Sequence, residues 1–94
     1  MKKNIAFDIV AKHINKWDSW GLLSGGAPLD EYDIETQRIV NALPLIQNQM
    51  NLAHTIKEVF DQAFGEEHDL ENCINVAKDI WDELMREEDT TFFN

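Results

Sequence analysis

Few residues of this chain have the types and spacing that chemistry requires, and the nearest to a metal site are two pairs four positions apart. His54 and Glu58 form one pair and Glu31 and Glu35 the other, so each pair would share one helix face and could contact one ion. A di-iron centre in a helical bundle needs a Glu-x-x-His motif on each of two helices, and the sequence contains none. Because such pairs are frequent on ordinary helix surfaces, we expect no metal site and no cofactor.

Other candidate groups lead to the same conclusion. Ser24-Gly25-Gly26 is glycine-rich, but it lacks the G-x-x-x-x-G-K-[ST] spacing of a phosphate-binding loop, and the acids that follow it would repel a phosphate. Cys73, the only cysteine, falls on an apolar stripe, which predicts a buried and unreactive thiol. His13 and His68 have no acidic partner set evident from the sequence. We therefore expect no catalytic residue and a protein that is not an enzyme.

Apolar residues that recur at spacings of three and four predict the helices that position these groups. The first helix covers about residues 4–18, and the second runs from Asp30 or Glu31 to Leu43, where Pro44 ends or kinks it. Three glycines and a proline between them mark an irregular loop. We expect this loop to fold back over the helices, because it also carries apolar side chains, namely Trp20, Leu22 and Leu23.

Two further helices complete the predicted fold. The third is capped by Asn48 or Asn51 and ends before Gly65, and the fourth is capped by Asp69. No strand-like alternation competes, so the sequence predicts one all-α domain over residues 1–94, a small four-helix bundle or helical array with a Gly/Pro-containing loop between its first two helices. The expected core comprises Ala6 or Phe7, Val10, Ile14, Trp17, Tyr32, Ile39, Val40, Leu43, Leu52, Ile56, Val59, Phe60, Ala63, Leu70, Cys73, Ile74, Ala77, Ile80, Trp81 and Leu84.

The charge of the chain indicates what kind of partner it would bind. Eighteen acidic residues face eight basic ones, a formal charge of −10 on 94 residues, and residues 66–89 hold ten of the acids. Such a chain repels nucleic acid and anionic membranes and attracts basic proteins. The basic N-terminus precedes no signal-peptide core, and no apolar run is long enough to span a bilayer. We expect a soluble cytoplasmic protein with a basic protein partner, and leave its oligomeric state open.

Two acidic patches compete as the partner-binding surface. One lies on the predicted fourth helix and consists of Asp79, Asp82 and Glu83. The other lies beside the apolar loop residues Trp20 and Leu22 and consists of Asp30, Glu31, Asp33 and Glu35. Affinity comes from a desolvated anchor, whereas charge mainly raises the association rate, so we expect the second patch to make the specific contact and the fourth helix to steer the approach. Two alternatives stay open: Asp30 could cap the second helix, and Trp20 could be buried against the bundle.

The C-terminal segment 87–94 is predicted to be an acidic and aromatic tail. Its Phe92 and Phe93 either dock onto the bundle or engage a partner, and the sequence favours neither.

Several short motifs along the chain resemble the signature of one family. These are Trp17-Asp18, Gly21-Leu22-Leu23, Gly26-Ala27-Pro28, Asp30-Glu31-Tyr32-Asp33-Ile34-Glu35, Ile56-Lys57-Glu58-Val59-Phe60, Cys73 and Ala77-Lys78-Asp79-Ile80. The chain is similar over about residues 14–85 to a domain-of-unknown-function family of short acidic proteins from Bacillus-like bacteria. It departs from that family at Ser19, where the pattern usually has a proline after Trp-Asp. The resemblance implies a compact α-helical domain with no assigned enzymatic activity.

The size and acidity of the chain are also similar to those of immunity proteins, which neutralise a toxin domain encoded at the same locus. The expected function is therefore that of a non-enzymatic immunity protein that masks a basic toxin, for example a nuclease whose substrate groove is basic. The alternative is a structural or regulatory helical module that self-associates and has no toxin partner.

Overall fold

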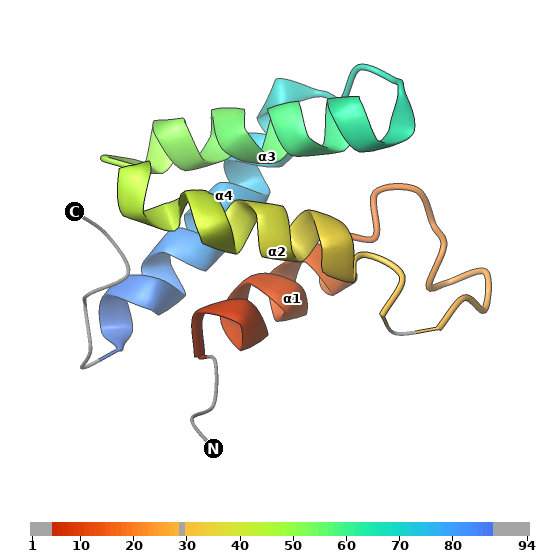
Figure 1. Cartoon of the computed structure of the whole chain (residues 1–94), viewed down its shortest axis with the longest axis horizontal. Helices are drawn as coiled ribbons and strands as arrows, with labels where there is room; N and C mark the ends of the chain where they lie inside the picture. The colour runs from red at the N-terminus through yellow and green to blue at the C-terminus, as the bar shows by residue number, and fades with distance from the viewer. Residues whose placement is uncertain (1–4, 29, 88–94) are drawn as a thin grey trace.

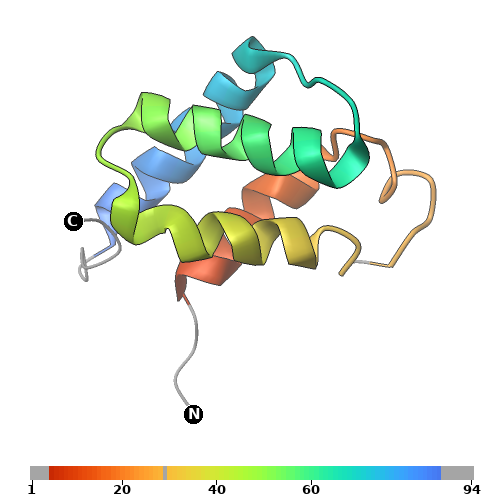
Figure 2. The same ribbon diagram turned by 45° about the horizontal axis from the view of Figure 1, so that its top comes forward.

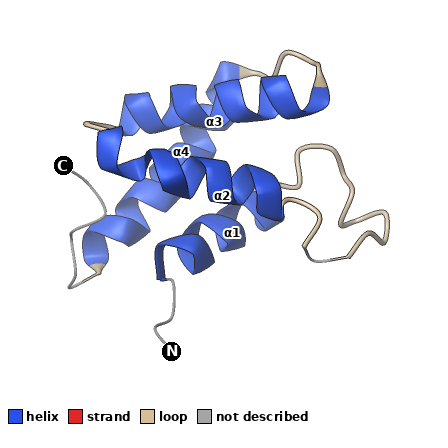
Figure 3. Ribbon diagram, viewed as in Figure 1, coloured by secondary structure: helices blue, strands red, loops and turns tan. Residues whose placement is uncertain are grey.

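The computed structural model describes residues 5–28 and 30–87, and within them it contains four α-helices and one short 3-10 helix. Helix α1 spans Ile5–Trp17, α2 Asp33–Ala42, α3 Gln49–Phe64 and α4 Leu70–Arg86, while the 3-10 helix η1 spans Leu43–Leu45. Figure 3 shows helices and loops, and no strand, among these residues. The all-α prediction is confirmed.

The four helices pack around one core. In Figure 1, α2 lies between α1 and α3, and α4 crosses behind them. The view in Figure 2 shows the same arrangement, with α1 and α4 on the side of α2 and α3 that faces away. Helices α3 and α4 form the most extensive pair, and α1 contacts both α2 and α4. None of the described helices combines the length and the apolarity needed to cross a bilayer.

Local sequence signals fix the ends of α3 and α4. The Asn48 side chain accepts a hydrogen bond from the Asn51 amide at 2.8 Å, and the Asp69 side chain accepts one from the Glu71 amide at 2.9 Å. Gly65 has a φ of 68° and ends α3 in the left-handed region that glycine adopts without steric penalty. Asn48 is thus the cap of α3, and Asn51 donates to it.

Helix α2 begins later than the sequence predicted. Asp30 and Glu31 lie in a turn, the α-helix starts at Asp33, and Asp30 contributes only its carbonyl, which accepts from the Asp33 amide at 3.1 Å. Asp30 is therefore not a side-chain cap. At the other end, Pro44 converts the continuation into the 3-10 turn η1.

Most of the predicted stripe residues are buried, with a few differences. Ala63 is exposed, and Phe64 packs against the core in its place. Trp17 and Trp81 are half-buried at the core margin. The sequence did not predict six further buried residues, namely Ile9, Glu35, Thr36, Ile46, Ala53 and Val76.

Candidate functional site

The α1–α2 loop is held on the bundle by the carboxylate of Asp18. Its Oδ1 accepts hydrogen bonds from the Tyr32 hydroxyl at 2.6 Å and the Leu23 amide at 3.1 Å, while Oδ2 accepts from the Ser24 amide at 2.9 Å. The Tyr32 oxygen in turn accepts from the Trp20 amide at 3.3 Å. Leu22 and Leu23 pack against the core, so the loop folds back as predicted.

These bonds perturb both side chains that make them. The hydrogen bond from Tyr32, followed by those from the loop amides, holds the pKa of Asp18 below its ordinary value against the opposing effect of burial. Burial, together with the hydrogen bond to Asp18, raises the pKa of the fully buried Tyr32 phenol. Asp18 itself has a φ of 47°, a left-handed conformation that aspartate tolerates better than most residues.

Trp20, in the same loop, is a partly exposed anchor that two neighbouring residues hold in place. Its side chain is 42% exposed, yet its indole ring stacks on Phe64 with the ring centroids 5.2 Å apart. The indole Nε1–H donates to Nε2 of His68 at 2.9 Å. The alternative of a fully buried Trp20 is therefore wrong, and the side chain is fixed in place while part of its surface stays open.

His68 connects this tryptophan to helix α3. Its ring Nδ1 lies 2.8 Å from Asp61 Oδ1 and 3.1 Å from the Glu66 carbonyl oxygen, and both of these groups are acceptors. Since indole N–H can only donate, His68 accepts at Nε2 and carries its proton at Nδ1. No acidic partner of His68 was evident from the sequence, and the structure corrects this, because the turn after α3 brings the histidine back to Asp61.

Asp61 carries further bonds that stabilise its charged form. Burial alone would raise the pKa of Asp61, but hydrogen bonds from Lys57 Nζ, the His68 amide and the His68 ring hold it below its ordinary value. The same bond to Asp61 raises the pKa of Lys57.

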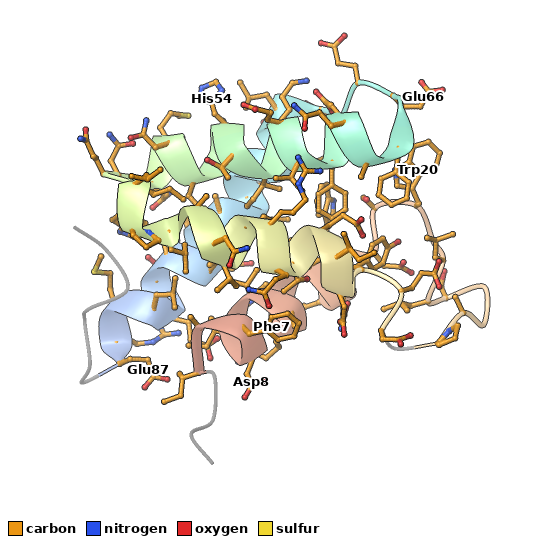
Figure 4. All side chains as sticks on the ribbon, viewed as in Figure 1. Phe7, Asp8, Trp20, His54, Glu66 and Glu87 are labelled. Atoms are coloured by element: carbon orange, nitrogen blue, oxygen red, sulfur yellow. The ribbon has the colours of Figure 1, made fainter. Side chains whose placement is uncertain are left out.

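A cleft of about 320 Å³ opens beside Trp20, and we call it the Trp20 cleft. It lies where the α1–α2 loop meets the α3–α4 connection, and Figure 4 shows Trp20 and Glu66 at this end of the molecule. Its walls contain three acids, and no lysine or arginine is among the described residues that line it. The lining residues are Trp17, Ser19, Trp20, Glu66, Glu67, His68, Asp69 and Asn72.

The predicted patch at residues 30–35 is only partly available to a partner. Asp30 and Glu31 are exposed, and Asp33 and Leu22 are half-buried. Glu35 is only 9% exposed, because it lies on the inward face of α2 between Tyr32 and Ile39. The expectation that Glu35 belongs to an exposed acidic surface is therefore wrong.

The acidic face of α4 is also more neutralised than the sequence suggested. Glu83 Oε1 lies 2.6 Å from Lys12 Nζ and 2.8 Å from His13 Nε2, both on α1. The hydrogen bond from Lys12, aided by that from His13, lowers the pKa of Glu83 against the effect of burial. Asp82 pairs with Lys78 at 3.2 Å, and Asp79 is exposed. His13 thus has an acidic partner, and Glu83 serves the α1–α4 contact.

The candidate metal pair and the single cysteine lie in different environments on α3 and α4. Within residues 5–28 and 30–87, no group of three or more His, Cys, Asp or Glu side chains is placed to hold a metal ion. His54 and Glu58 both lie on the exposed face of α3. Cys73 is fully buried, and burial raises the pKa of its thiol to about 11, which disfavours the reactive thiolate. Phe92 and Phe93 lie outside the described residues.

Sequence reasoning missed the acids that surround Trp20 in space. Glu66, Glu67 and Asp69 were counted in the charge but not placed beside the loop, because 48 positions separate the bonded pair Trp20 and His68. Helical periodicity describes neighbours along one element and carries no signal for a contact between two connections.

The chain belongs to the family described as a domain of unknown function (DUF1871), which it matches over residues 9–85. That match covers α1 from Ile9, all of α2 and α3, and α4 as far as Met85, so the Asp18–Tyr32 bond and the Trp20 cleft lie within it. Comparison with curated proteins and with solved structures gave no match.

Proposed function

We propose that this protein is a non-enzymatic binding protein for a basic protein partner and that it makes its specific contact through Trp20 and the acids of the Trp20 cleft. The observation that carries the proposal is a half-exposed tryptophan, fixed by stacking on Phe64 and by its bond to His68, beside three carboxylates. Interfaces draw most of their affinity from such anchors, and a side chain that is already ordered loses little entropy on binding.

The charge distribution supports a basic partner. Glu66, Glu67 and Asp69 are all exposed, and the formal charge of −10 adds long-range attraction to any cationic surface. Asp79, also exposed, and the loop acids Asp30 and Glu31 would contribute to steering. Asp33 is half-buried and is a weaker candidate than the sequence suggested.

The most specific form of this proposal is an immunity protein that neutralises a toxin. A nuclease with a basic substrate groove is one example of such a toxin. An acidic surface with a fixed aromatic anchor is suited to covering such a groove. In this form of the proposal the protein acts in the cytoplasm of the producing cell, where a nuclease would act. Its motifs are similar to those of proteins from Bacillus-like bacteria, so such bacteria are the first place to search for the toxin.

Co-expression tests this form directly. A toxin encoded beside the gene should stop growth when produced alone and should be harmless when co-produced with this protein. Glu66→Lys/Glu67→Lys should lose protection. Glu58→Lys/Glu71→Lys is the matched control, because it reverses two exposed acids that do not line the cleft.

A capture experiment tests the broader proposal where no such neighbouring gene exists. The wild type should capture a basic protein from the native cytoplasm, and Glu66→Lys/Glu67→Lys should not. Equal capture by both proteins would contradict the assigned surface.

Exposed apolar side chains favour one second candidate, a helical module that self-associates. Leu45 on η1 is 79% exposed, Ile34 on α2 74% and Met50 at the start of α3 47%. Sedimentation equilibrium separates the two candidates: a dimer that Leu45→Ser disrupts would support self-association, and a monomer at all concentrations would reject it.

A further inference from the structure

The side chains that line the Trp20 cleft favour the binding of one kind of ligand. Its charged side chains are the carboxylates of Glu66, Glu67 and Asp69, which accept hydrogen bonds and repel anions. His68 is occupied at both ring nitrogens, by Trp20 on one side and by Asp61 on the other. The cleft therefore favours a ligand that donates hydrogen bonds and carries a positive charge.

Ser19 adds an independent indication. It lines the cleft, and its hydroxyl oxygen is buried without a hydrogen-bond partner among the described residues. A buried polar atom in this state costs about 1–3 kcal/mol. A ligand with N–H donors would recover this cost only after the Ser19 side chain rotates towards the cleft, because the oxygen has no accessible surface of its own.

We infer that the Trp20 cleft binds the side chain of an arginine from the partner, with its guanidinium group over the open face of the Trp20 indole and its N–H groups directed to the cleft carboxylates. The inference rests on the proposed function and names the chemistry that the binding surface selects. Phe64 covers one face of the indole and His68 bonds its N–H edge, so the other face is the one on which a guanidinium group would stack.

Arginine fits these walls better than lysine. Guanidinium is planar, stacks on aromatic rings and presents five donors in a fork that matches carboxylates, whereas ammonium is a compact and strongly hydrated charge. The volume of about 320 Å³ is at the lower end for ligand pockets, which suits one long side chain with part of its backbone.

One basic residue of this chain lies close enough to compete. Lys57 Nζ is 3.6 Å from Glu67 Oε1, but it is held by Asp61 at 2.6 Å. Glu67 is mostly exposed and is free to turn towards a stronger partner. The ligand would therefore replace only the weaker of the two contacts of Lys57.

Three short peptides test the inference: acetyl-Gly-Arg-Gly-amide, the same peptide with lysine, and the same peptide with citrulline, a neutral isostere of arginine. Each is titrated into the protein while the indole N–H signal of Trp20 is followed by NMR. The arginine peptide should shift this signal saturably, with a dissociation constant of about 1 mM or below. Lysine should bind about three- to tenfold more weakly, and citrulline should give no saturable shift.

Two variants locate the effect. Glu66→Gln/Glu67→Gln should weaken the arginine peptide by about tenfold, whereas Glu58→Gln/Glu71→Gln, which removes the same charge outside the cleft, should change it less than about twofold. Similar affinity for the arginine and citrulline peptides, or an equal loss of affinity in both variants, would overturn the inference.

The failure of this inference can be told from the failure of the proposed function. If the native partner binds the wild type and Glu66→Gln/Glu67→Gln equally, the arginine site fails while partner binding stands. If the peptides behave as expected but no basic partner is found, the proposed function fails alone.

Discussion

Tyr32 donates its phenolic hydrogen to Asp18 across 2.6 Å, and this bond joins the residue that follows α1 to the residue that precedes α2. The same carboxylate also binds the amides of Leu23 and Ser24, so a single side chain organises the loop that carries Trp20. Asp18 and Tyr32, both within the part of the chain that matches the family, therefore have a structural role here.

Tyr32→Phe removes this bond and leaves the ring in the core. The charged acceptor then loses its shortest partner, so we expect the melting temperature to fall by at least about 4 °C. Ser24→Ala keeps the backbone amide that Asp18 binds and loses only an exposed hydrogen bond from the hydroxyl to the Gly21 carbonyl. It should therefore change the melting temperature by less than about 2 °C. Thermal unfolding followed by circular dichroism measures both, and equal falls would mean that the hydroxyl is not the main attachment of the loop.

The stability of the fold should depend on pH, because folding lowers the pKa values of three carboxylates. These are Asp18, Asp61 and Glu83. A group with a lowered folded pKa contributes its full stability above its unfolded pKa and loses that contribution as the pH falls through the folded value. The free energy of unfolding should therefore be flat near neutral pH and decline below about pH 5. Urea unfolding between pH 3 and 7 measures the curve. Asp18→Asn should be less stable at pH 7 and show a shallower decline, and a curve parallel to that of the wild type would contradict the role given to Asp18.

The helices and several of their ends could be predicted because the signals are local. Asn48, Gly65 and Asp69 each act within one turn of the helix end that they define. The contacts Trp20–His68 and His13–Glu83 could not be predicted, because the two residues of each pair lie 48 and 70 positions apart in the sequence. The burial of Glu35 is a different case. It stands three residues after Tyr32 and four before Ile39, so the helical period did place it inward, but its charge drew the prediction towards solvent.

Glu35→Lys should destabilise the fold rather than probe an interface. A lysine at a position only 9% exposed must either bury its charge or disturb the packing of α2, at a cost of about 1–3 kcal/mol. Glu31→Lys, at a nearby exposed position, should stay within about 0.5 kcal/mol of the wild type. Urea unfolding compares the two, and equal stabilities would show that α2 accommodates a charge at residue 35.

The thiol of Cys73 should be protected in the native state. Its burial and its pKa of about 11 leave little thiolate at pH 8, so iodoacetamide should modify it only through unfolding. Mass spectrometry of the native protein and of the protein in urea gives the two rates. Modification at the same rate in both would mean that the packing of α4 exposes the thiol readily.

The bond between Trp20 and His68 predicts an uncommon state of the histidine ring. Because the indole N–H donates to Nε2, and Asp61 accepts at Nδ1, neutral His68 should carry its proton on Nδ1. Nitrogen NMR of the imidazole ring distinguishes the two tautomers directly. Trp20→Phe keeps an aromatic ring to stack on Phe64 but removes the donor to Nε2. Because Asp61 still accepts at Nδ1, the proton should stay on Nδ1 and the Nε2 signal alone should shift. Trp81→Phe should change neither nitrogen signal, because Trp81 lies on α4 outside the cleft. A proton found on Nε2 in the neutral wild-type ring would show that His68 does not hold Trp20 in place.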